Sequence, residues 1–125
     1  MMSDETQQVL FANEAFYLAF SQKDPLAMDA LWSRDAPLVC VHPGWRRLVE
    51  RAEIMASWQR ILENPEQPGM DFLEPQAHEY GLMTLVTCYE QLPSGVCLAT
   101  NGFVAEQGGY RMVLHHSGAC AYGLP

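Results

Sequence analysis

The chain has 125 residues, 49% of them hydrophobic, which suits one domain over residues 1–125 with a core of its own. Fifteen acidic and seven basic residues give a net charge of −8, which repels nucleic-acid phosphates and anionic membrane surfaces. No apolar run reaches the roughly 20 residues that span a bilayer, and the N-terminal MMSDETQQ lacks a basic signal-peptide region. We therefore expect a cytoplasmic protein with no nucleic-acid or membrane partner.

The first half of the chain has the periodicity of helices. Apolar residues recur on one face of residues 5–22, with Ser3 or Asp4 available as the helix cap. Asp24 before Pro25 predicts a second, short helix that ends near residue 32. Residues 37–43 alternate as a short strand, and residues 50–63 carry the apolar stripe of a third helix.

The second half of the chain has the pattern of strands. Four segments, at about 70–80, 82–92, 96–106 and 110–122, are separated by turns that contain Gly81, Gly95 and Gly108. Sequential hairpins of this kind form an antiparallel, strongly curved sheet. The sequence thus predicts an α+β fold in which three N-terminal helices pack on a curved, mainly antiparallel sheet.

Alternation assigns the faces of the last two strands. On residues 110–122 we expect His116 to face the helices with Met112, and His115 to face outward. On residues 96–106 the inner face is expected to hold Asn101 among small residues that leave room for a cavity: Cys97, Ala99 and Ala105. The outer face of that strand is an apolar stripe that consists of Val96, Leu98, Thr100 and Val104.

The four cysteines and the glycines point to neither a metal nor a cofactor. No CxxC pair is present, and Cys40, Cys88, Cys97 and Cys120 all lie in apolar runs, as buried reduced thiols do. Cys40 and His42 share a strand face, but the close-spaced ligand pairs of a zinc site are missing. No phosphate-cradling glycine motif occurs either.

Three strings resemble the nuclear transport factor 2-like superfamily, in particular its SnoaL-like and ketosteroid isomerase branch. They are FYLAFSQKDPLAMDALWSRDAPLVCVHPGW, IMASWQRIL and LATNGFVAEQGGYRMVLHHSG. The resemblance implies a cone-shaped fold with an internal pocket and a homodimer formed through the outer sheet face. Family members include isomerases, dehydratases, polyketide cyclases, epoxide hydrolases and modules without catalysis, so the fold alone does not choose a function.

The resemblance also suggests site residues. His42, just before a proline, falls where ketosteroid isomerases hold their general base, and Asn101 falls where they hold an oxyanion donor. Their donor tyrosine of the first helix falls at Phe16, next to Tyr17. A histidine can accept a proton near neutral pH, an amide can stabilise an oxyanion, and His116 can serve as a second acid or base.

Each of these polar residues also has a structural interpretation. His42 can fix the turn that follows it by donating to a backbone carbonyl, His116 can be a core histidine, and Asn101 can bridge to backbone or buried water. We expect the ligand wall to comprise Phe16, Tyr17, Trp45, Met55, Trp58 and Met112.

Two hypotheses follow: a cofactor-free acid–base isomerase, cyclase or dehydratase acting on a small cyclic carbonyl compound, or a non-catalytic binding or dimerisation module. The second predicts an Asn101 whose hydrogen bonds all go to protein.

Overall fold

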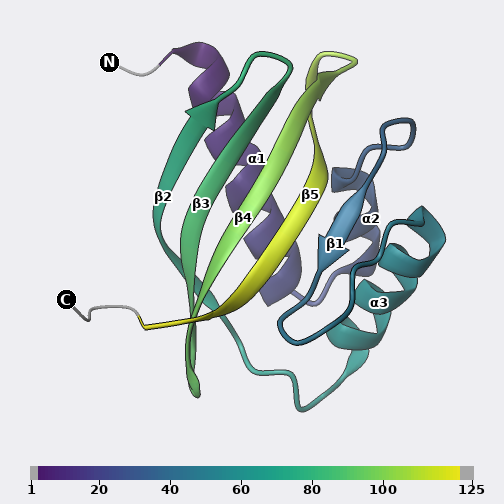
Figure 1. The fold of residues 1–125 in the computed structure, drawn as a ribbon. Helices are drawn as coiled ribbons and strands as arrows, with labels where there is room; N and C mark the ends of the chain where they lie inside the picture. The colour runs from purple at the N-terminus through teal and green to yellow at the C-terminus, as the bar shows by residue number, and fades with distance from the viewer. Residues whose placement is uncertain (1–2, 122–125) are drawn as a thin grey trace.

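The computed structural model describes residues 3–121, and its helices and strands follow the predicted order (Figure 1). The end of the last predicted strand, at residue 122, lies outside the described residues. The elements are α1 (Asp4–Ser21), α2 (Pro25–Leu31), β1 (Val39–Val41), α3 (Arg51–Glu63), β2 (Asp71–Glu79), β3 (Met83–Leu92), β4 (Gly95–Glu106) and β5 (Gly109–Cys120).

Two of the helices begin at the predicted caps. The Ser3 hydroxyl accepts the backbone N–H of Thr6, and the Asp24 carboxylate accepts that of Ala27, both at 3.1 Å. Each cap satisfies a backbone donor that the first turn of a helix leaves free. Within residues 3–121, no helix combines the length and apolarity that a membrane span requires.

The sheet has five strands in the order β1-β5-β4-β3-β2. The pairs between β2, β3, β4 and β5 are antiparallel, whereas β1 runs parallel to β5. Gln107 and Gly108 both have positive φ angles, 45° and 81°, which is the geometry of the tight hairpin turn that joins β4 to β5. This mixed, mostly antiparallel sheet with three helices confirms the predicted α+β class.

The three helices lie on one face of the sheet, with α1 crossing it and α2 and α3 beyond its β1 edge (Figure 1). The core between the layers contains Phe16 and Phe20, as predicted, together with Trp32, Ile54 and Phe103. The apolar stripe of β4 lies on the opposite face, where Leu98 is 42% exposed and its three companions are half-buried.

β5 contains a bulge that reverses the predicted facing of its histidines. Gly102 pairs with Leu114 and Phe103 pairs with Met112, so Val113 is an extra residue without a partner on β4. Met112 and Val113 are therefore both buried, and the alternation shifts by one after them. His115 is buried and His116 is exposed, so the prediction that His116 faces the helices and His115 faces outward is wrong.

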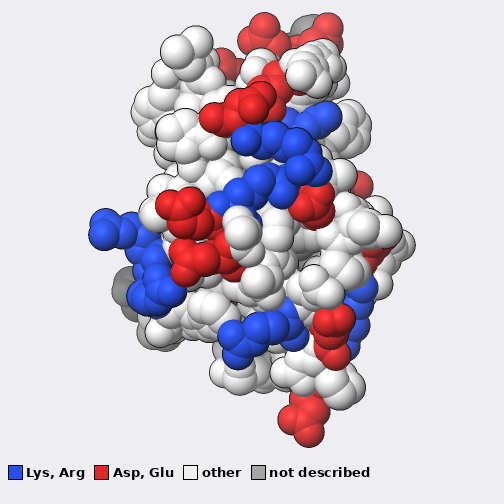
Figure 2. Space-filling view, turned by 90° about the vertical axis from the view of Figure 1, so that its right-hand side faces the viewer, with Lys and Arg blue, Asp and Glu red and all other residues white. Residues whose placement is uncertain are grey.

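Basic side chains gather on the face formed by α2, β1 and α3, where acidic ones interrupt them (Figure 2). Asp29 forms ion pairs with Arg34 at 2.7 Å and with Arg51 at 2.8 Å, and Arg46 pairs with Glu53 at 3.0 Å. The hydrogen bond from Arg51 is the main reason that the pKa of Asp29 lies below its usual value. This face therefore carries charge of both signs in close pairs.

Candidate functional site

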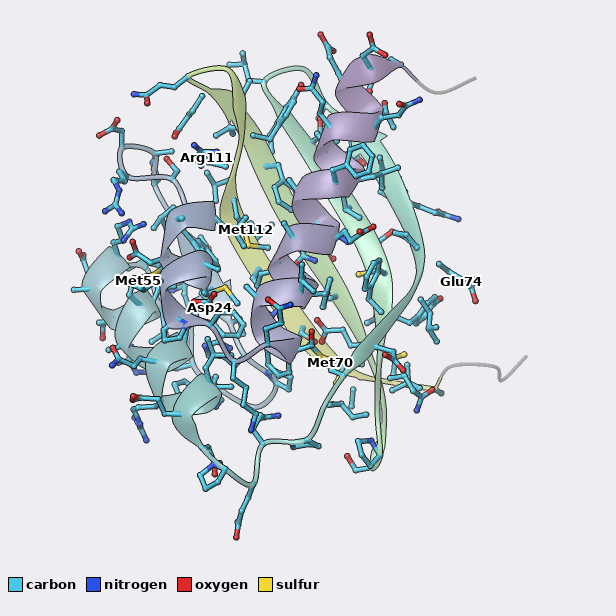
Figure 3. All side chains as sticks on the ribbon, turned by 180° about the vertical axis from the view of Figure 1, so that it is seen from behind. Asp24, Met55, Met70, Glu74, Arg111 and Met112 are labelled. Atoms are coloured by element: carbon cyan, nitrogen blue, oxygen red, sulfur yellow. The ribbon has the colours of Figure 1, made fainter. Side chains whose placement is uncertain are left out.

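A cavity of about 220 Å³ opens beside the end of β1. Its wall combines residues of α1, the turn after β1, α3, the connection that leads to β2, and strands β3 and β5. Met70, which Figure 3 labels near the C-terminal end of α1, belongs to this wall. The lining residues are Phe20, His42, Pro43, Trp45, Trp58, Ile61, Gln67, Met70, Glu90, Leu92 and His115.

His42 is held on this wall by a helix and not by the turn that follows it. Its Nε2 lies 2.8 Å from the Ser57 hydroxyl oxygen, which donates its own proton to the Ile54 carbonyl at 2.7 Å. Nε2 must therefore be the donor to Ser57, which leaves the lone pair of the imidazole on Nδ1. The ring packs against Trp45 and Trp58, and burial lowers the pKa of His42 to about 4.

His115 enters the cavity wall because of the β5 bulge. Its Nδ1 lies 2.7 Å from Oδ1 of Asn101, whose Nδ2 donates to Asn13 and Tyr17. Since the amide oxygen can only accept, His115 carries its proton on Nδ1, and Nε2 keeps the lone pair on the side away from Asn101. Burial, followed by the charge of His42, lowers the pKa of His115 to about 3.

The cavity thus presents two neutral imidazoles in an aromatic setting. The ring centroids of His42 and His115 are 6.2 Å apart, and Trp58 packs against both rings. Because each ring uses one nitrogen to bond inside the protein, each has one lone pair left. Two imidazole bases at this spacing can take a proton from one position of a bound molecule and return it at another.

Glu90 is the carboxyl group of the site. It accepts hydrogen bonds of 2.6 Å from the Tyr17 hydroxyl and of 2.6 Å from the Ser117 hydroxyl. Burial is the main cause that raises the pKa of Glu90 above its usual value, and burial likewise raises that of Tyr17. The cavity wall therefore meets a buried polar network at this point.

Two of the three predicted catalytic residues are not on the cavity. Asn101 donates to Asn13 at 2.8 Å and to Tyr17 at 3.1 Å and accepts from His115, so all three hydrogen bonds go to protein groups. It lies behind His115 and does not line the wall, so it cannot hold a ligand oxygen there. His116 lies on the outer sheet face. Of the three, the structure places only His42 on the wall.

The predicted ligand wall is also divided. Trp45 and Trp58 line the cavity, whereas Phe16 and Met112 are fully buried core residues. Figure 3 shows Met112 between the sheet and the helices and Met55 on α3 toward α2, outside the cavity lining. Tyr17 belongs to the buried network, where α1 fills the space over β4 that the small residues were expected to leave open.

Sequence reasoning missed much of the site, including its polar residues Ser57, Glu90, His115 and Ser117. Glu90 carried a readable signal, because it alternates with Val86 and Cys88 on the inner face of β3, where an acid is unusual. Ser57 lies three residues after Ile54 in the apolar stripe of α3. His115 and Ser117 could not be found without the bulge.

The cysteines are free thiols, of which Cys40, Cys88 and Cys97 are buried and Cys120 is half-buried. The Sγ atom of Cys40 lies 3.7 Å from Nε2 of His42, and burial raises the pKa of Cys40 to about 12. In the part of the chain that the structure describes, no three His, Cys, Asp or Glu side chains are grouped so that they could hold a metal ion.

Comparison with known proteins gives a family and a fold. Residues 9–122 match the SnoaL-like domain, which confirms the resemblance. A "putative dehydratase" of the NTF2-like family from Streptomyces avermitilis is 28% identical, with a TM-score of 0.84 over 93% of this chain and 96% of that chain. A "putative calcium/calmodulin-dependent protein kinase type II association domain" from Thiobacillus denitrificans is 28% identical, with a TM-score of 0.76 over 88% of this chain and 93% of that chain. The F-box protein SKIP8 of Arabidopsis thaliana is 29% identical over 119 residues, 90% of this chain and 49% of that protein, so the chain spans about half of that relative's length.

Proposed function

The chain belongs to the SnoaL-like domain family, and we propose that its cavity binds a small apolar or cyclic molecule with a carbonyl or hydroxyl group and moves a proton on it without a cofactor. The observation that carries this proposal is the pair of neutral imidazoles, His42 and His115, on one aromatic cavity wall. An apolar protein cavity of about 150 Å³ takes up benzene. The cavity of about 220 Å³ therefore suits a ring compound somewhat larger than benzene.

The two histidines decide the class of reaction. With pKa values of about 4 and about 3, both imidazoles are neutral at pH 7, so neither brings a proton to the reaction. His42 or His115 takes a proton from the carbon beside the carbonyl, and the imidazolium so formed returns it. When the proton is returned to another carbon, the reaction is an isomerisation. When it is returned to a hydroxyl on the carbon next to the deprotonated one, water leaves and the reaction is a dehydration. A base with a pKa near 4 suffices, since ketosteroid isomerase uses one of about 4.6.

One of these two outcomes matches the name of a similar protein. The Streptomyces protein is named as a putative dehydratase, which is one of the two reaction classes. Of the two bases, His42 is the better candidate to take the proton first, because its ring packs against the partly exposed Trp45. Trp45, 39% exposed at the rim, and Trp58, deeper in the wall, would hold the ring of the ligand.

One observation favours the second candidate function, a ligand-binding module without catalysis. All hydrogen bonds of Asn101 go to protein groups, so the amide predicted to stabilise a developing oxyanion does not reach the ligand. In that case the cavity binds the same class of molecule, and the histidines only orient it.

Proton abstraction from a small ketone separates the two candidates. The probes are cyclohexanone in D₂O, whose α-hydrogen exchange is followed by NMR, and 3-cyclohexen-1-one, whose double-bond migration is followed by ultraviolet absorbance. His42→Ala should slow both reactions by about 100-fold or more, with binding of the probe within a few-fold of the unsubstituted protein. His116→Gln, on the outer face, is the matched control and should change neither. Unchanged rates in His42→Ala would leave the binding module as the function.

We also propose that the chain forms a homodimer through the outer sheet face. The stripe of Val96, Leu98, Thr100 and Val104 is apolar, and Leu98 is 42% exposed although it lies mid-strand. Such a face is a usual site of protein association. The similar Thiobacillus protein is named for a role in association, which supports the same use of the fold.

A further inference from the structure

A chain of hydrogen bonds runs from the cavity wall into the core, and all of its donors point in one direction. His115 donates from Nδ1 to Oδ1 of Asn101 at 2.7 Å, and Asn101 donates from Nδ2 to the Tyr17 oxygen at 3.1 Å. Tyr17 donates to Oε2 of Glu90 at 2.6 Å, and Ser117 donates to the other carboxyl oxygen at 2.6 Å. Every proton in the chain is thus directed toward the carboxyl group of Glu90.

The neutral members of this chain would also fit the opposite direction. An amide rotated by 180° exchanges its oxygen and nitrogen, a phenol hydroxyl can turn, and an imidazole can carry its proton on either nitrogen. Two side branches are reversible in the same way: Asn13 accepts the second N–H of Asn101 at 2.8 Å, and Cys88 donates to the Tyr17 oxygen at 3.2 Å. Glu90 differs from all of these, because a carboxylate only accepts.

From this geometry we infer that Glu90 is a positioning residue that acts through Tyr17 and Asn101 to fix the proton of His115 on Nδ1. Glu90 takes the Tyr17 proton, so the Tyr17 oxygen must accept from the amide of Asn101. The oxygen of that amide then faces His115 and accepts from Nδ1. The unprotonated Nε2 of His115 is thereby kept available at the cavity that this residue lines. His115 is otherwise buried, with 3% of its surface exposed.

The consequence for proton transfer rests on the proposed function, since only an unprotonated Nε2 can accept a proton from a ligand. The position of the proton itself is a property of the free protein and needs no ligand. A measurement of where the His115 proton lies therefore tests this inference independently of the ketone reactions.

Nitrogen-15 NMR of histidine-labelled protein tests the inference. Long-range proton–nitrogen correlations distinguish protonated from unprotonated ring nitrogens, and a His115→Gln sample assigns His115 among the four histidines. In the unsubstituted protein we expect Nδ1 protonated and Nε2 unprotonated. Glu90→Met removes both acceptor oxygens at similar length, so the Tyr17 hydroxyl must turn to the amide oxygen of Asn101. The proton of His115 should then move to Nε2 in half or more of the molecules.

Two further variants separate positioning from general damage to the core. Glu90→Gln keeps the size of the side chain, but an amide fits either direction, so it should give a mixture of the Nδ1–H and Nε2–H forms. Ser117→Ala removes the other donor to the same carboxyl group and should leave the Nδ1–H form unchanged. Should Glu90→Met fail to fold, Tyr17→Phe cuts the same chain and should give a mixture of the two forms. An Nε2–H form in the unsubstituted protein, or a pure Nδ1–H form in both Glu90→Met and Tyr17→Phe, would overturn the inference.

Discussion

The two buried histidines should make the fold lose stability when the solution is acidified from pH 7 to pH 5. In the folded protein the pKa of His42 is about 4 and that of His115 is about 3, whereas an unfolded histidine has a pKa of about 6.5. Because the unfolded state binds protons first, the contribution to stability is complete above pH 6.5. It falls as the pH drops from there toward the pKa values of the folded state.

The structure gives the size of the effect. Each bound proton changes the free energy of unfolding by about 1.4 kcal/mol per pH unit, so each histidine removes about 2 kcal/mol between pH 7 and pH 5. Together they remove about 4 kcal/mol, a large part of the roughly 5–15 kcal/mol that stabilises an ordinary domain. Glu90 opposes this change, because its raised pKa lets the folded state bind a proton as the pH falls.

Urea unfolding at pH 8, 7, 6 and 5, followed by the fluorescence of the buried Trp32 and Trp58, measures the effect. His115→Gln should remove about half of the pH dependence between pH 7 and pH 5. His116→Gln alters the exposed neighbour, whose charge is the smallest cause of the lowered pKa of His115, and should change the dependence far less. A stability that is flat from pH 7 to pH 5, or an undiminished dependence in His115→Gln, would refute the reasoning.

Three further predictions concern packing, assembly and the buried network. Gly102→Ala should lower the free energy of unfolding, measured with urea, by about 1–3 kcal/mol, because a Cβ there would lie 3.0 Å from a β5 side chain. A Cβ at Gly118 would meet nothing within 4 Å, so Gly118→Ala should lower it by less than half as much. Light scattering should give twice the 14.1 kDa of one chain, and Leu98→Glu should reduce it to one; a single-chain mass without the substitution would contradict the dimer. Tyr17→Phe and Glu90→Met, combined in a double-mutant cycle, should show a coupling of about 1–3 kcal/mol from their 2.6 Å hydrogen bond, and additive effects would argue against it.

The helices could be predicted from the sequence because their start signals are local. Ser3 and the pair Asp24-Pro25 act on backbone groups within three residues of themselves, and the structure has both helices beginning there. The hairpins could be predicted for a similar reason, since Gly108, in the turn between β4 and β5, is the residue type that a positive φ angle favours. None of these signals depends on a distant partner.

The facing of His115 could not be predicted from β5 alone. Alternation assumes regular pairing, and a single extra residue, Val113, exchanges the two faces of everything after it. The available signal lay on the partner strand β4, where Gly102 stands opposite the bulge, as glycines at bulges often do. The buried network was equally hidden, because Tyr17 and Glu90 are separated by 73 positions in the sequence.

The buried polar chain is better explained by orientation than by stability. Burying a carboxylate costs several kcal/mol, which hydrogen bonds offset only in part, and well-packed apolar residues at such positions are often as stable or more so. The neighbouring inner positions are filled in that apolar way, by Val86 and Phe103. What Glu90 adds is a direction for the hydrogen bonds that reach His115, and an apolar side chain cannot supply one. A core selected for stability alone has no need of that direction, whereas a cavity that must present an unprotonated imidazole nitrogen does.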